Sequence, residues 1–425
     1  MDRKIILLSI SIAVLTAHPL SCYASYRETT LSLAKAEQLA ISTAPELQQL
    51  QANADSLRAQ AVADGQWADP QLIVGAANVP TNSFSFNQDD MTMVQFGLQQ
   101  SFAPGHSLAM KSKKTNALAK AQQEKIQEQV AMLLRNVRET WLDLYYWHQA
   151  AKVVRENRSL YRRLLKATES QYSSGKGTQS DVLQIQVEVT RLNDQMAQVE
   201  QRIDVLRAQL GRWIGVDAAN RPLSNSLPHW SNPISAATLQ AKLLQHPLLK
   251  VDTANIEAAR DEVDYAKEQY KPGWMAEVGY ATRRGRMEDG QPRSDFVGAQ
   301  VTIDLPLFAG GRQDQRLRAS AYQLTSTQLD RDIHYKDLLK ELTVQYAVWK
   351  SYSKRLSLYH HHLVPEATQN SKAALLAYQS ATTDLTTVLR AYSNQLTIRL
   401  EQTQIEVERA KARAAILYLE GVTSC

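Results

Sequence analysis

The chain has 425 residues, of which 48 are Lys or Arg and 43 are Asp or Glu, giving a formal net charge of +5. Only 16 glycines and 13 prolines interrupt long stretches rich in Ala, Gln, Leu, Lys, Arg and Glu, a composition typical of extended helices and not of several compact globules. Acidic and basic residues are interspersed along these stretches, so they indicate solvated helix faces and no nucleic-acid partner.

The first residues predict a secretory signal peptide over 1–24. A basic start (2–4) precedes an apolar run (5–15), and Cys22 and Ala24 fit the −3 and −1 positions of a cleavage site. The apolar run is too short to span a membrane, and no later stretch has ~18 consecutive apolar residues. A second interpretation of the same segment is a degenerate lipobox in which Cys22 is acylated.

An internal repeat organises the rest of the chain. Matching residues recur in order at an offset of 202 that grows to 206, which indicates two copies of one unit. We expect the first repeat over 25–214, the second over 236–425, and an irregular connector rich in Asn, Pro and Ser over 215–235. The matched positions include Pro45 and Pro247, Arg58 and Arg260, Pro70 and Pro272, Tyr172 and Tyr378, and Leu183 and Leu389.

Each repeat begins with a helical stretch, over 32–68 or 236–271, and continues with two strands. The strands are expected at about 70–80 and 91–103, and at about 273–283 and 295–307. Along the last of them, Gly298, Gln300, Thr302 and Asp304 fall on one face, and apolar residues fall on the other. Such strands are typical of a β-barrel with an apolar face toward lipid and a polar face toward water. A soluble hairpin with one face on a core is the alternative.

The next part of each repeat predicts a very long helix. Gly105 to Tyr172 and Gly311 to Tyr378 are each 67 residues apart, which corresponds to about 100 Å of helix. The returning stretches, 178–213 and 384–421, are about half as long, and 178–213 together with 236–271 recovers the full length. We therefore expect, twice, a long helix beside two half-length helices stacked end to end.

The first returning stretch also carries a coiled-coil pattern. Its apolar residues recur at alternating steps of three and four over more than four heptads, which predicts a continuous buried seam. The seam consists of Val182, Ile185, Val189, Leu192, Met196, Val199, Ile203, Leu206, Leu210 and Trp213.

The two strand-and-helix units and the two tyrosine-centred turns resemble the outer membrane efflux protein family, the TolC-like channels. The turn after Tyr172 has that family's pattern of a Gly three residues on and a polar run ending in Asp-Val-Leu. The turn after Tyr378 departs from it, with Ala381 for the Gly and Thr387 for the Asp. The resemblance covers about residues 30–421. It implies a mainly α fold with a transmembrane β-barrel: a homotrimer gives four strands per chain to one 12-stranded barrel, and its helices form a long periplasmic α-helical barrel.

The resemblance also implies a function. The chain would be a passive exit duct across the periplasm and outer membrane, in contact with outer-membrane lipid, a periplasmic adaptor (membrane fusion) protein and an inner-membrane RND transporter. It would be no enzyme and need no cofactor, and no Ser/His/Asp set, P-loop, CxxC or HExxH motif argues otherwise. The alternatives are a duct for drug efflux or type I protein secretion, and a soluble periplasmic coiled-coil adaptor.

A narrower resemblance is to the heavy-metal branch of the family, the outer-membrane partners of cation-exporting pumps. It predicts that the solute is a cation such as copper, silver, zinc, cobalt or cadmium. The residues that carry it are 68–72 (Ala-Asp-Pro-Gln-Leu), 78–80 (Asn-Val-Pro), and 91–93 (Met-Thr-Met) leading to 102–105 (Phe-Ala-Pro-Gly).

Candidate functional residues follow from the resemblance and from local chemistry. The periplasmic tip, which would contact the adaptor, comprises Gly175, Lys176, Gly177, Thr178, Ala381, Thr382 and Thr383. Asp181 and Asp384 are gate candidates, since three copies of each would form an acidic ring that favours cations, although both also suit a helix N-terminus. Arg390 stands where related channels often carry an acidic gate residue, so it reverses the expected charge.

Two further groups of residues have metal-binding side chains. Met91 and Met93 share the parity of the polar strand face and would suit soft Cu(I), although methionines more often fill space. His360, His361 and His362 point about 100° apart on a helix and cannot converge on one ion, so a surface or packing role is expected, with a kink near Pro365.

Overall fold

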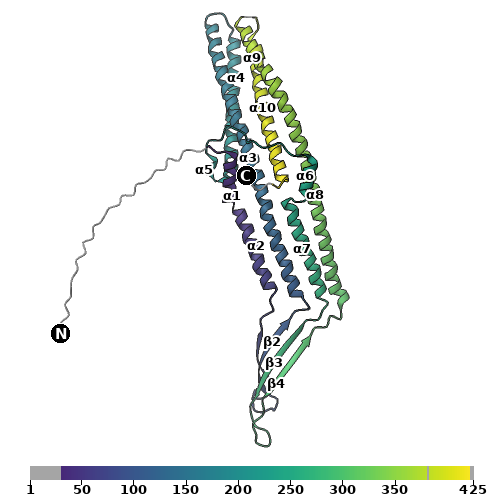
Figure 1. Ribbon diagram of the computed structural model, residues 1–425. Coiled ribbons are helices and arrows are strands. Elements are labelled where there is room, and N and C mark those ends of the chain that lie inside the picture. The colour runs from purple at the N-terminus through teal and green to yellow at the C-terminus, as the bar shows by residue number, and fades with distance from the viewer. Residues whose placement is uncertain (1–29, 381, 422–425) are drawn as a thin grey trace, which may run out of the picture.

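The computed structural model describes residues 30–380 and 382–421. The expected signal peptide, Cys22 and Ala381 lie outside these residues. The described chain is a long rod of helices that ends in a small sheet (Figure 1). Within the described ranges, none of the helices combines the length and the apolar character needed to cross a membrane.

The second half of the chain repeats the order of elements of the first half. The first repeat consists of α1 (Leu33–Thr43), α2 (Pro45–Asp64), β1 (Gln71–Ala77), β2 (Met93–Phe102), α3 (Ser107–Ser173) and α4 (Gln179–Ile214). A short α5 (Val216–Ala219) lies in the connector. The second repeat consists of α6 (Ala236–Leu243), α7 (Pro247–Glu268), β3 (Trp274–Arg283), β4 (Phe296–Ile303), η1 (Ala309–Gly311), α8 (Gln313–Leu358), η2 (Tyr359–Leu363), α9 (Val364–Gln379) and α10 (Leu385–Leu419).

The helical stretch that opens each repeat is two helices and not one. Pro45 and Pro247 each occupy the first position of the second helix, where the missing N–H removes no helical hydrogen bond. The residue before each proline is pushed into an extended conformation, with ψ of 107° at Ala44 and 138° at His246. The repeated proline is therefore a helix boundary.

The long helices differ between the repeats. In the first repeat, α3 runs unbroken for 67 residues, or about 100 Å. In the second, the equivalent stretch is α8, a π-turn over Tyr359–Leu363, and α9. Pro365 is the second residue of α9, just after the π-turn. It has no N–H to donate to the carbonyl of His361, which accounts for the local change in helix geometry. The kink expected near Pro365 therefore takes the form of a π-turn.

Half-length helices stack end to end beside the long ones, but the pairing differs from the expected one. Thr43 at the end of α1 donates to the carbonyl oxygen of Trp213 in α4 at 2.9 Å. His246, before α7, contacts the carbonyl oxygen of Tyr418 in α10 at 3.2 Å. Each returning helix thus meets the opening helices of its own repeat, as Figure 1 shows. The expectation that 178–213 stacks on 236–271 is wrong, because equal lengths do not specify which helices are neighbours.

The core lies where these helices meet along α3. Six of the ten residues in the heptad seam of α4 are buried there, with Ile185 and Leu210 fully inaccessible, and the other four are partly buried. Between α1 and α3 the ion pair of Glu37 and Arg138 is also buried, at 2.5 Å, and Trp141 donates to the carbonyl oxygen of Leu31. A buried polar group is costly unless it is paired, so these contacts fix the position of α1 on α3.

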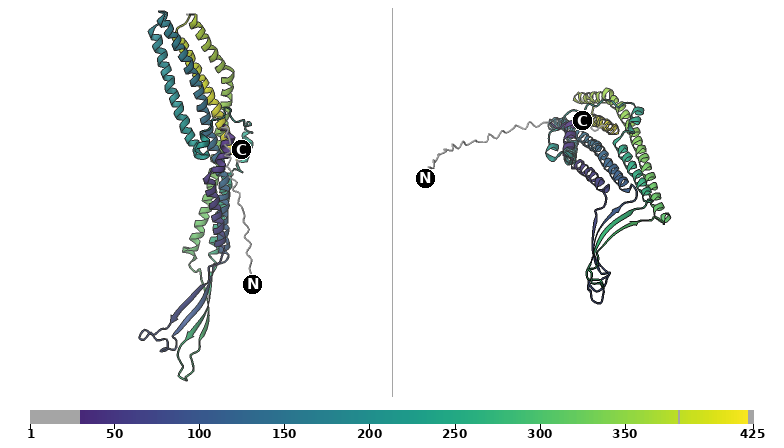
Figure 2. Two further views of the ribbon diagram at one scale, coloured as in Figure 1. Left: turned by 90° about the vertical axis from the view of Figure 1, so that its left-hand side faces the viewer. Right: turned by 60° about the horizontal axis from the view of Figure 1, so that its bottom comes forward.

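The sheet continues the rod at the end opposite the helix turns (Figure 2). Its four strands are antiparallel, in the order β1-β2-β3-β4, so β2 and β3 join the two repeats. Among the described residues, β1 and β4 each pair with one strand only, which leaves the outer row of backbone groups on both edges without partners in the sheet.

Candidate functional site

One face of the sheet is apolar and exposed. Leu98 in β2 lies between Leu72 in β1 and Val278 in β3, and the next row contains Val74, Phe96, Tyr280 and Val297. Leu98 and Val278 remain about 60% exposed, at 60% and 58%. A soluble hairpin with one face on a core would bury these side chains, and the residues that the structure describes place no core against this face.

The opposite face is polar. We call the row formed by Gln71, Gln99, Glu277 and Gln300 the polar row, because the register places these four residues side by side across all four strands. The adjacent row contains Gly97, Gly279 and Gly298, which we call the glycine row. Ile73, Met275 and Phe296 also lie on this face, but its polar row and its glycines make it more polar than the opposite face and better suited to contact with water.

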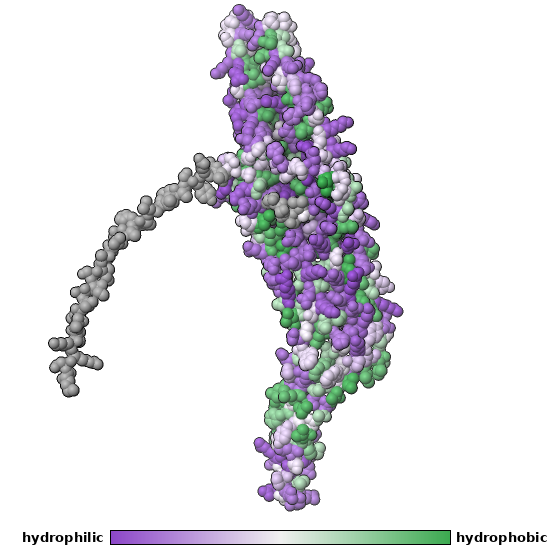
Figure 3. All heavy atoms as spheres, in the orientation of Figure 1, coloured by the Kyte–Doolittle hydropathy of each residue, from purple (hydrophilic) through white to green (hydrophobic). Residues whose placement is uncertain are grey.

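An aromatic cluster lies where the sheet meets the helices. The rings of Phe102 and Trp274 stack with centroids 3.9 Å apart, and Trp67 contacts Phe102 edge-on at 5.3 Å. Figure 3 shows hydrophobic side chains gathered over this part of the sheet. Aromatic residues at one end of an apolar band are typical of a membrane–water interface.

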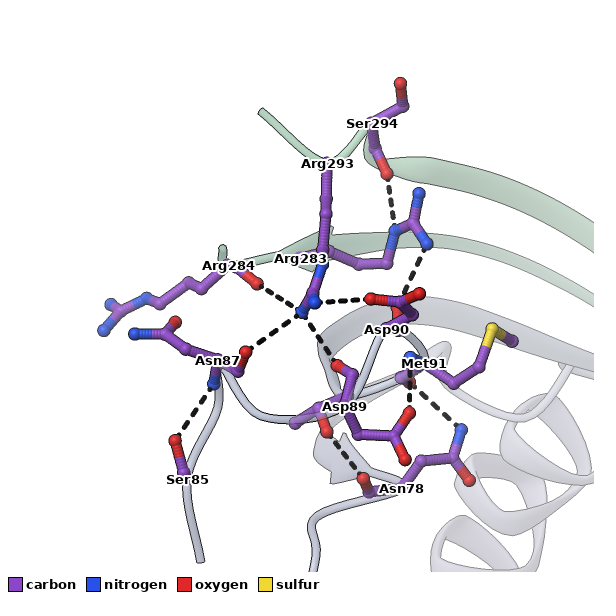
Figure 4. A network of polar contacts seen from close by, with 11 residues as sticks. Asn78, Ser85, Asn87, Asp89, Asp90, Met91, Arg283, Arg284, Arg293 and Ser294 are labelled. Carbon is purple, nitrogen blue, oxygen red and sulfur yellow. Dashed lines mark hydrogen bonds and ion pairs between the residues drawn. The ribbon is translucent and has the colours of Figure 1, made fainter. Parts of the chain in front are cut away.

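The far ends of the strands are joined by two loops, 78–92 and 284–295, which we call the distal loops. Arg293 connects them: its guanidinium pairs with Asp90 and donates to the carbonyl oxygens of Asp89 at 2.9 Å and Arg284 at 3.1 Å (Figure 4). Arg283 adds bonds to the carbonyl oxygens of Asp90 and Ser294 (Figure 4). Two arginines from the second repeat therefore hold the loop of the first.

The two candidate methionines lie beside this loop contact but in different environments. Met91 belongs to the distal loop, where its side chain is half exposed and its carbonyl oxygen accepts from Asn78 at 3.1 Å. Met93 begins β2 and is buried, with its sulfur 3.4 Å from Nε2 of Gln95. Across the residues that the structure describes, no group of three or more His, Cys, Asp and Glu is placed to hold a metal.

The helix turns at the other end of the rod are built alike in the two repeats. Gly175 adopts a positive φ of 74°, which lets the N–H of Lys176 reach the carbonyl oxygen of Gln171 at 2.9 Å. At the equivalent place in the second repeat, the N–H of Thr382 reaches the carbonyl oxygen of Ala377, also at 2.9 Å. These backbone bonds end the long helices, and Lys176 and Thr382 are exposed there.

The two gate candidates both cap the returning helices. Asp181 is the third residue of α4 and forms a capping box with Thr178, whose hydroxyl it meets at 2.7 Å. Asp384 is the N-cap of α10. Hydrogen bonds from Thr387, and then the charge of Arg390, hold the pKa of Asp384 below its usual range. The carboxylate of Asp384 is therefore ionised at neutral pH, and both caps lie at the exposed end of the rod (Figure 1).

The three consecutive histidines do not converge. His360 lies 3.5 Å from Glu406, His361 bonds the carbonyl oxygen of Ser357 at 2.8 Å, and His362 faces Glu366 at 3.7 Å. Three different partners account for the three rings, as the helical spacing predicts.

Two features of the site were not singled out from the sequence. Glu277 lies on the polar parity of its strand, but only the pairing of β3 with β2 places it beside Gln99. The contact of Arg293 with Asp90 joins residues some 200 positions apart, and no local pattern in the sequence indicates it.

Comparison with known proteins identifies this architecture. A rod of paired long and half-length helices with a four-stranded sheet at one end is the fold of TolC-like channels, and the outer membrane efflux protein family matches residues 37–216 and 238–422. The chain belongs to this family, whose place is the outer membrane.

Individual relatives are more distant. The alkaline protease secretion protein AprF of Pseudomonas aeruginosa is 22% identical over 248 residues, which cover 56% of this chain and 50% of the relative. The match thus spans half the length of that relative. The solved outer-membrane channel OprN is 17% identical with a TM-score of 0.77, over 92% of this chain and 89% of OprN.

Two further solved structures share the fold. The outer membrane protein VceC of Vibrio cholerae is 16% identical with a TM-score of 0.75, over 92% of this chain and 96% of VceC. CusC is 16% identical with a TM-score of 0.74, over 91% of both chains.

Proposed function

We propose that three copies of this chain form an outer-membrane channel that is the passive exit duct of a tripartite efflux pump. The observation that carries the proposal is the two-faced sheet with an unpaired edge on each side. An open sheet of four strands leaves backbone groups without partners, and lipid offers none. Pairing β4 of one copy with β1 of the next removes every edge and closes a 12-stranded barrel.

The dimensions of the strands support this placement. β2 has ten residues, which rise about 33 Å, and at a tilt of about 40° they span roughly 25 Å, the height of the apolar band of such barrels. The exposed apolar face then meets lipid, and the polar row faces the interior. Exposed apolar residues on α8, among them Tyr322, Leu329 and Ile333, support contact between copies along the rod.

The helical rod then crosses the periplasm and presents its turns to the rest of the pump. We assign adaptor contact to Gly175, Lys176, Gly177, Thr178, Ala381, Thr382 and Thr383, and gating to Asp181, Asp384 and Arg390. An inner-membrane RND transporter supplies the energy. The same proposal includes the division of the chain into a signal peptide over 1–24, repeats over 25–214 and 236–425, and a connector over 215–235.

For the solute we propose heavy-metal cations, such as copper, silver, zinc, cobalt or cadmium. The support is the set of sequence segments around Pro70, Pro80 and Met91–Met93, together with the carboxylate on the polar row. Protein secretion is the second candidate, because the curated relative AprF is named for secretion of an alkaline protease.

The proposal is tested first by fractionation and by light scattering of the purified protein in detergent. A trimer from the outer membrane is the expected result. A soluble periplasmic monomer or dimer would contradict the channel proposal and favour the periplasmic adaptor. Mass spectrometry of the mature protein shows whether Cys22 is removed or acylated.

The solute is tested in a deletion strain. Loss of the gene is expected to lower resistance to one or more of the five metals, with the wild-type gene restoring it. Unchanged metal resistance with altered drug resistance, or with retention of a secreted protein, would overturn the metal assignment and leave the duct in place.

A further inference from the structure

We propose that Glu277 determines the charge preference of the channel interior and makes the barrel selective for cations. The inference rests on the proposed trimeric channel. It starts from the polar row, in which Glu277 is the one charged residue beside Gln71, Gln99 and Gln300. In a trimer the row becomes a ring of three carboxylates and nine amides at one level of the interior. Rings of acidic side chains are a general device for selecting cations.

No residue that the structure describes neutralises the carboxylate of Glu277. Among the described residues it makes no hydrogen bond and no ion pair, and the neighbouring amide of Gln99 points instead to the sulfur of Met275. The nearest arginine along the same strand face is Arg283, six residues away and therefore about 20 Å along the strand. That distance is about twice the Debye length at 0.1 M salt, so the two charges are screened from each other.

Arg283 is also committed elsewhere. Its guanidinium donates to the carbonyl oxygens of Ser294 at 2.6 Å and Asp90 at 3.1 Å, and it lies 4.0 Å from the centre of the Phe296 ring. These contacts hold the positive charge within the distal loops. The positive and negative charges of the polar face are thus separated, with arginine at the far end and the free carboxylate nearer the helices.

The glycine row gives ions room beside the carboxylate. Glu277 and all three glycines of that row (Gly97, Gly279 and Gly298) line one hollow of the sheet. Oε1 of Glu277 lies 3.5 Å from the position that a Cβ on Gly97 would take, so the side chain reaches over this row. Three of the four positions in this row have no side chain, and Ile73 occupies the fourth, so the row leaves room for a hydrated cation beside the carboxylate.

A second carboxylate supports the same polarity. Asp304 follows β4 with the parity of Gln300, and its N–H donates to the carbonyl oxygen of Gly273 at 2.9 Å, which continues the register of the sheet. It therefore lies on the polar face, between the polar row and the helices. A cation that enters from the helical tunnel meets Asp304 first and Glu277 next, and an anion is repelled at both levels.

The test is a measurement of reversal potential for purified trimers in planar bilayers under a KCl gradient. Glu277→Gln is expected to lower the permeability ratio of K⁺ to Cl⁻ by about tenfold or more. One unit charge about 6 Å from the ion path in water favours K⁺ by about threefold and disfavours Cl⁻ by about threefold, and the variant removes three such charges from the trimer. Gln300→Glu adds a carboxylate to the same row and is expected to raise the ratio. Glu288→Gln, in a distal loop, removes the same charge away from the row and is the matched control.

The possible outcomes separate the two proposals. If the wild-type trimer conducts but neither Glu277→Gln nor Gln300→Glu changes the ratio, Glu277 is not the selectivity residue and the channel assignment stands. If Glu288→Gln lowers the ratio as much as Glu277→Gln, the effect comes from net charge and the inference is overturned. If the purified wild-type protein is not a trimer, the proposed function itself fails. Light scattering confirms that each variant is a trimer before it is recorded.

Discussion

Asp384 accepts the backbone N–H of Thr387 at 2.9 Å and its hydroxyl at 2.6 Å. Thr178 accepts the N–H of Asp181 at 3.1 Å in the other repeat, so the two caps contain the same pair of residues in exchanged order. Thr387 departs from the family's pattern, which has Asp there. Asp384 stands at the position equivalent to Thr178, 206 residues later, and Thr387 stands at the position equivalent to Asp181. The cap of the second repeat therefore still contains one Asp and one Thr. Both returning helices therefore begin with a side-chain cap.

The exchange of cap residues predicts which substitutions the tip tolerates. Asp384→Ala removes the acceptor and is expected to increase hydrogen exchange several-fold in the first turn of α10, over residues 385–389. The double variant Asp384→Thr with Thr387→Asp recreates the cap of the first repeat and is expected to keep wild-type protection. Thr178→Ala should cost about 1 kcal/mol in the other turn. Equal loss of protection in the single and double variants would contradict the capping role.

The pH dependence of this cap has a definite sign. The pKa of Asp384 in the folded protein lies below its usual value of 3.8, because Thr387 donates to the ionised form. Its contribution is therefore complete above pH 3.8 and is lost as the pH falls through the folded pKa. Protection of residues 385–389 is expected to be flat from pH 5 to pH 8, and Asp384→Asn, which keeps an acceptor but does not titrate, is the control.

His246 links α7 to α10 and predicts a second pH effect. Its Nε2 donates to the carbonyl oxygen of Tyr418, and its Nδ1 accepts the N–H of Leu248 at 3.3 Å. Only the neutral ring satisfies both bonds, because Nδ1 cannot accept when it is protonated. Burial of the ring lowers the pKa of His246 from 6.5 to about 4. The unfolded chain thus binds a proton more readily than the folded one between these values.

The free energy of unfolding should accordingly fall as the pH drops from about 6.5 to about 4. The contribution of His246 to this fall is up to about 3 kcal/mol. His246→Asn keeps an acceptor for Leu248 at the N-cap but does not titrate. Between pH 7 and pH 4.5 the apparent Tm of the variant is expected to fall less than that of the wild type, with both measured in detergent at the same scan rate. His229→Asn changes an exposed ring and should behave as wild type. Parallel Tm curves for His246→Asn and wild type would refute the assignment.

The features that the sequence predicted are those with a local period. Alternation predicted four strands and their two faces, and the steps of three and four predicted the seam of α4, whose Ile185 and Leu210 are buried. Contacts between distant segments had no such signal. The stacking of α10 on α7 depends on the contact of His246 with Tyr418, and equal helix lengths allowed another pairing. The neighbours of Glu277 likewise depend on the register between strands of different repeats.

Arg293 predicts how the distal loops respond to substitution. Its side chain is 8% exposed and bonds both loops, so Arg293→Gln is expected to free the loop over 78–92. Proteolysis of whole cells should cleave this loop several-fold faster in the variant. Arg286→Gln is the matched control, because Arg286 donates to the carbonyl oxygen of Gly290 within its own loop. Equal cleavage rates in the two variants would show that Arg293 does not hold the loops together.

The two faces of the sheet predict opposite effects of the same substitution. Val278 lies on the exposed apolar face near the middle of β3, where Arg would meet lipid at a cost of about 2–4 kcal/mol per chain. Val278→Arg is therefore expected to abolish trimers in the outer membrane. Gln99→Arg places the same charge on the polar face of the neighbouring strand. Gln99 pairs with Glu277, so water and that carboxylate compensate the charge. That variant should assemble normally and lower the K⁺ to Cl⁻ permeability ratio. Normal assembly of Val278→Arg would show that the apolar face does not meet lipid.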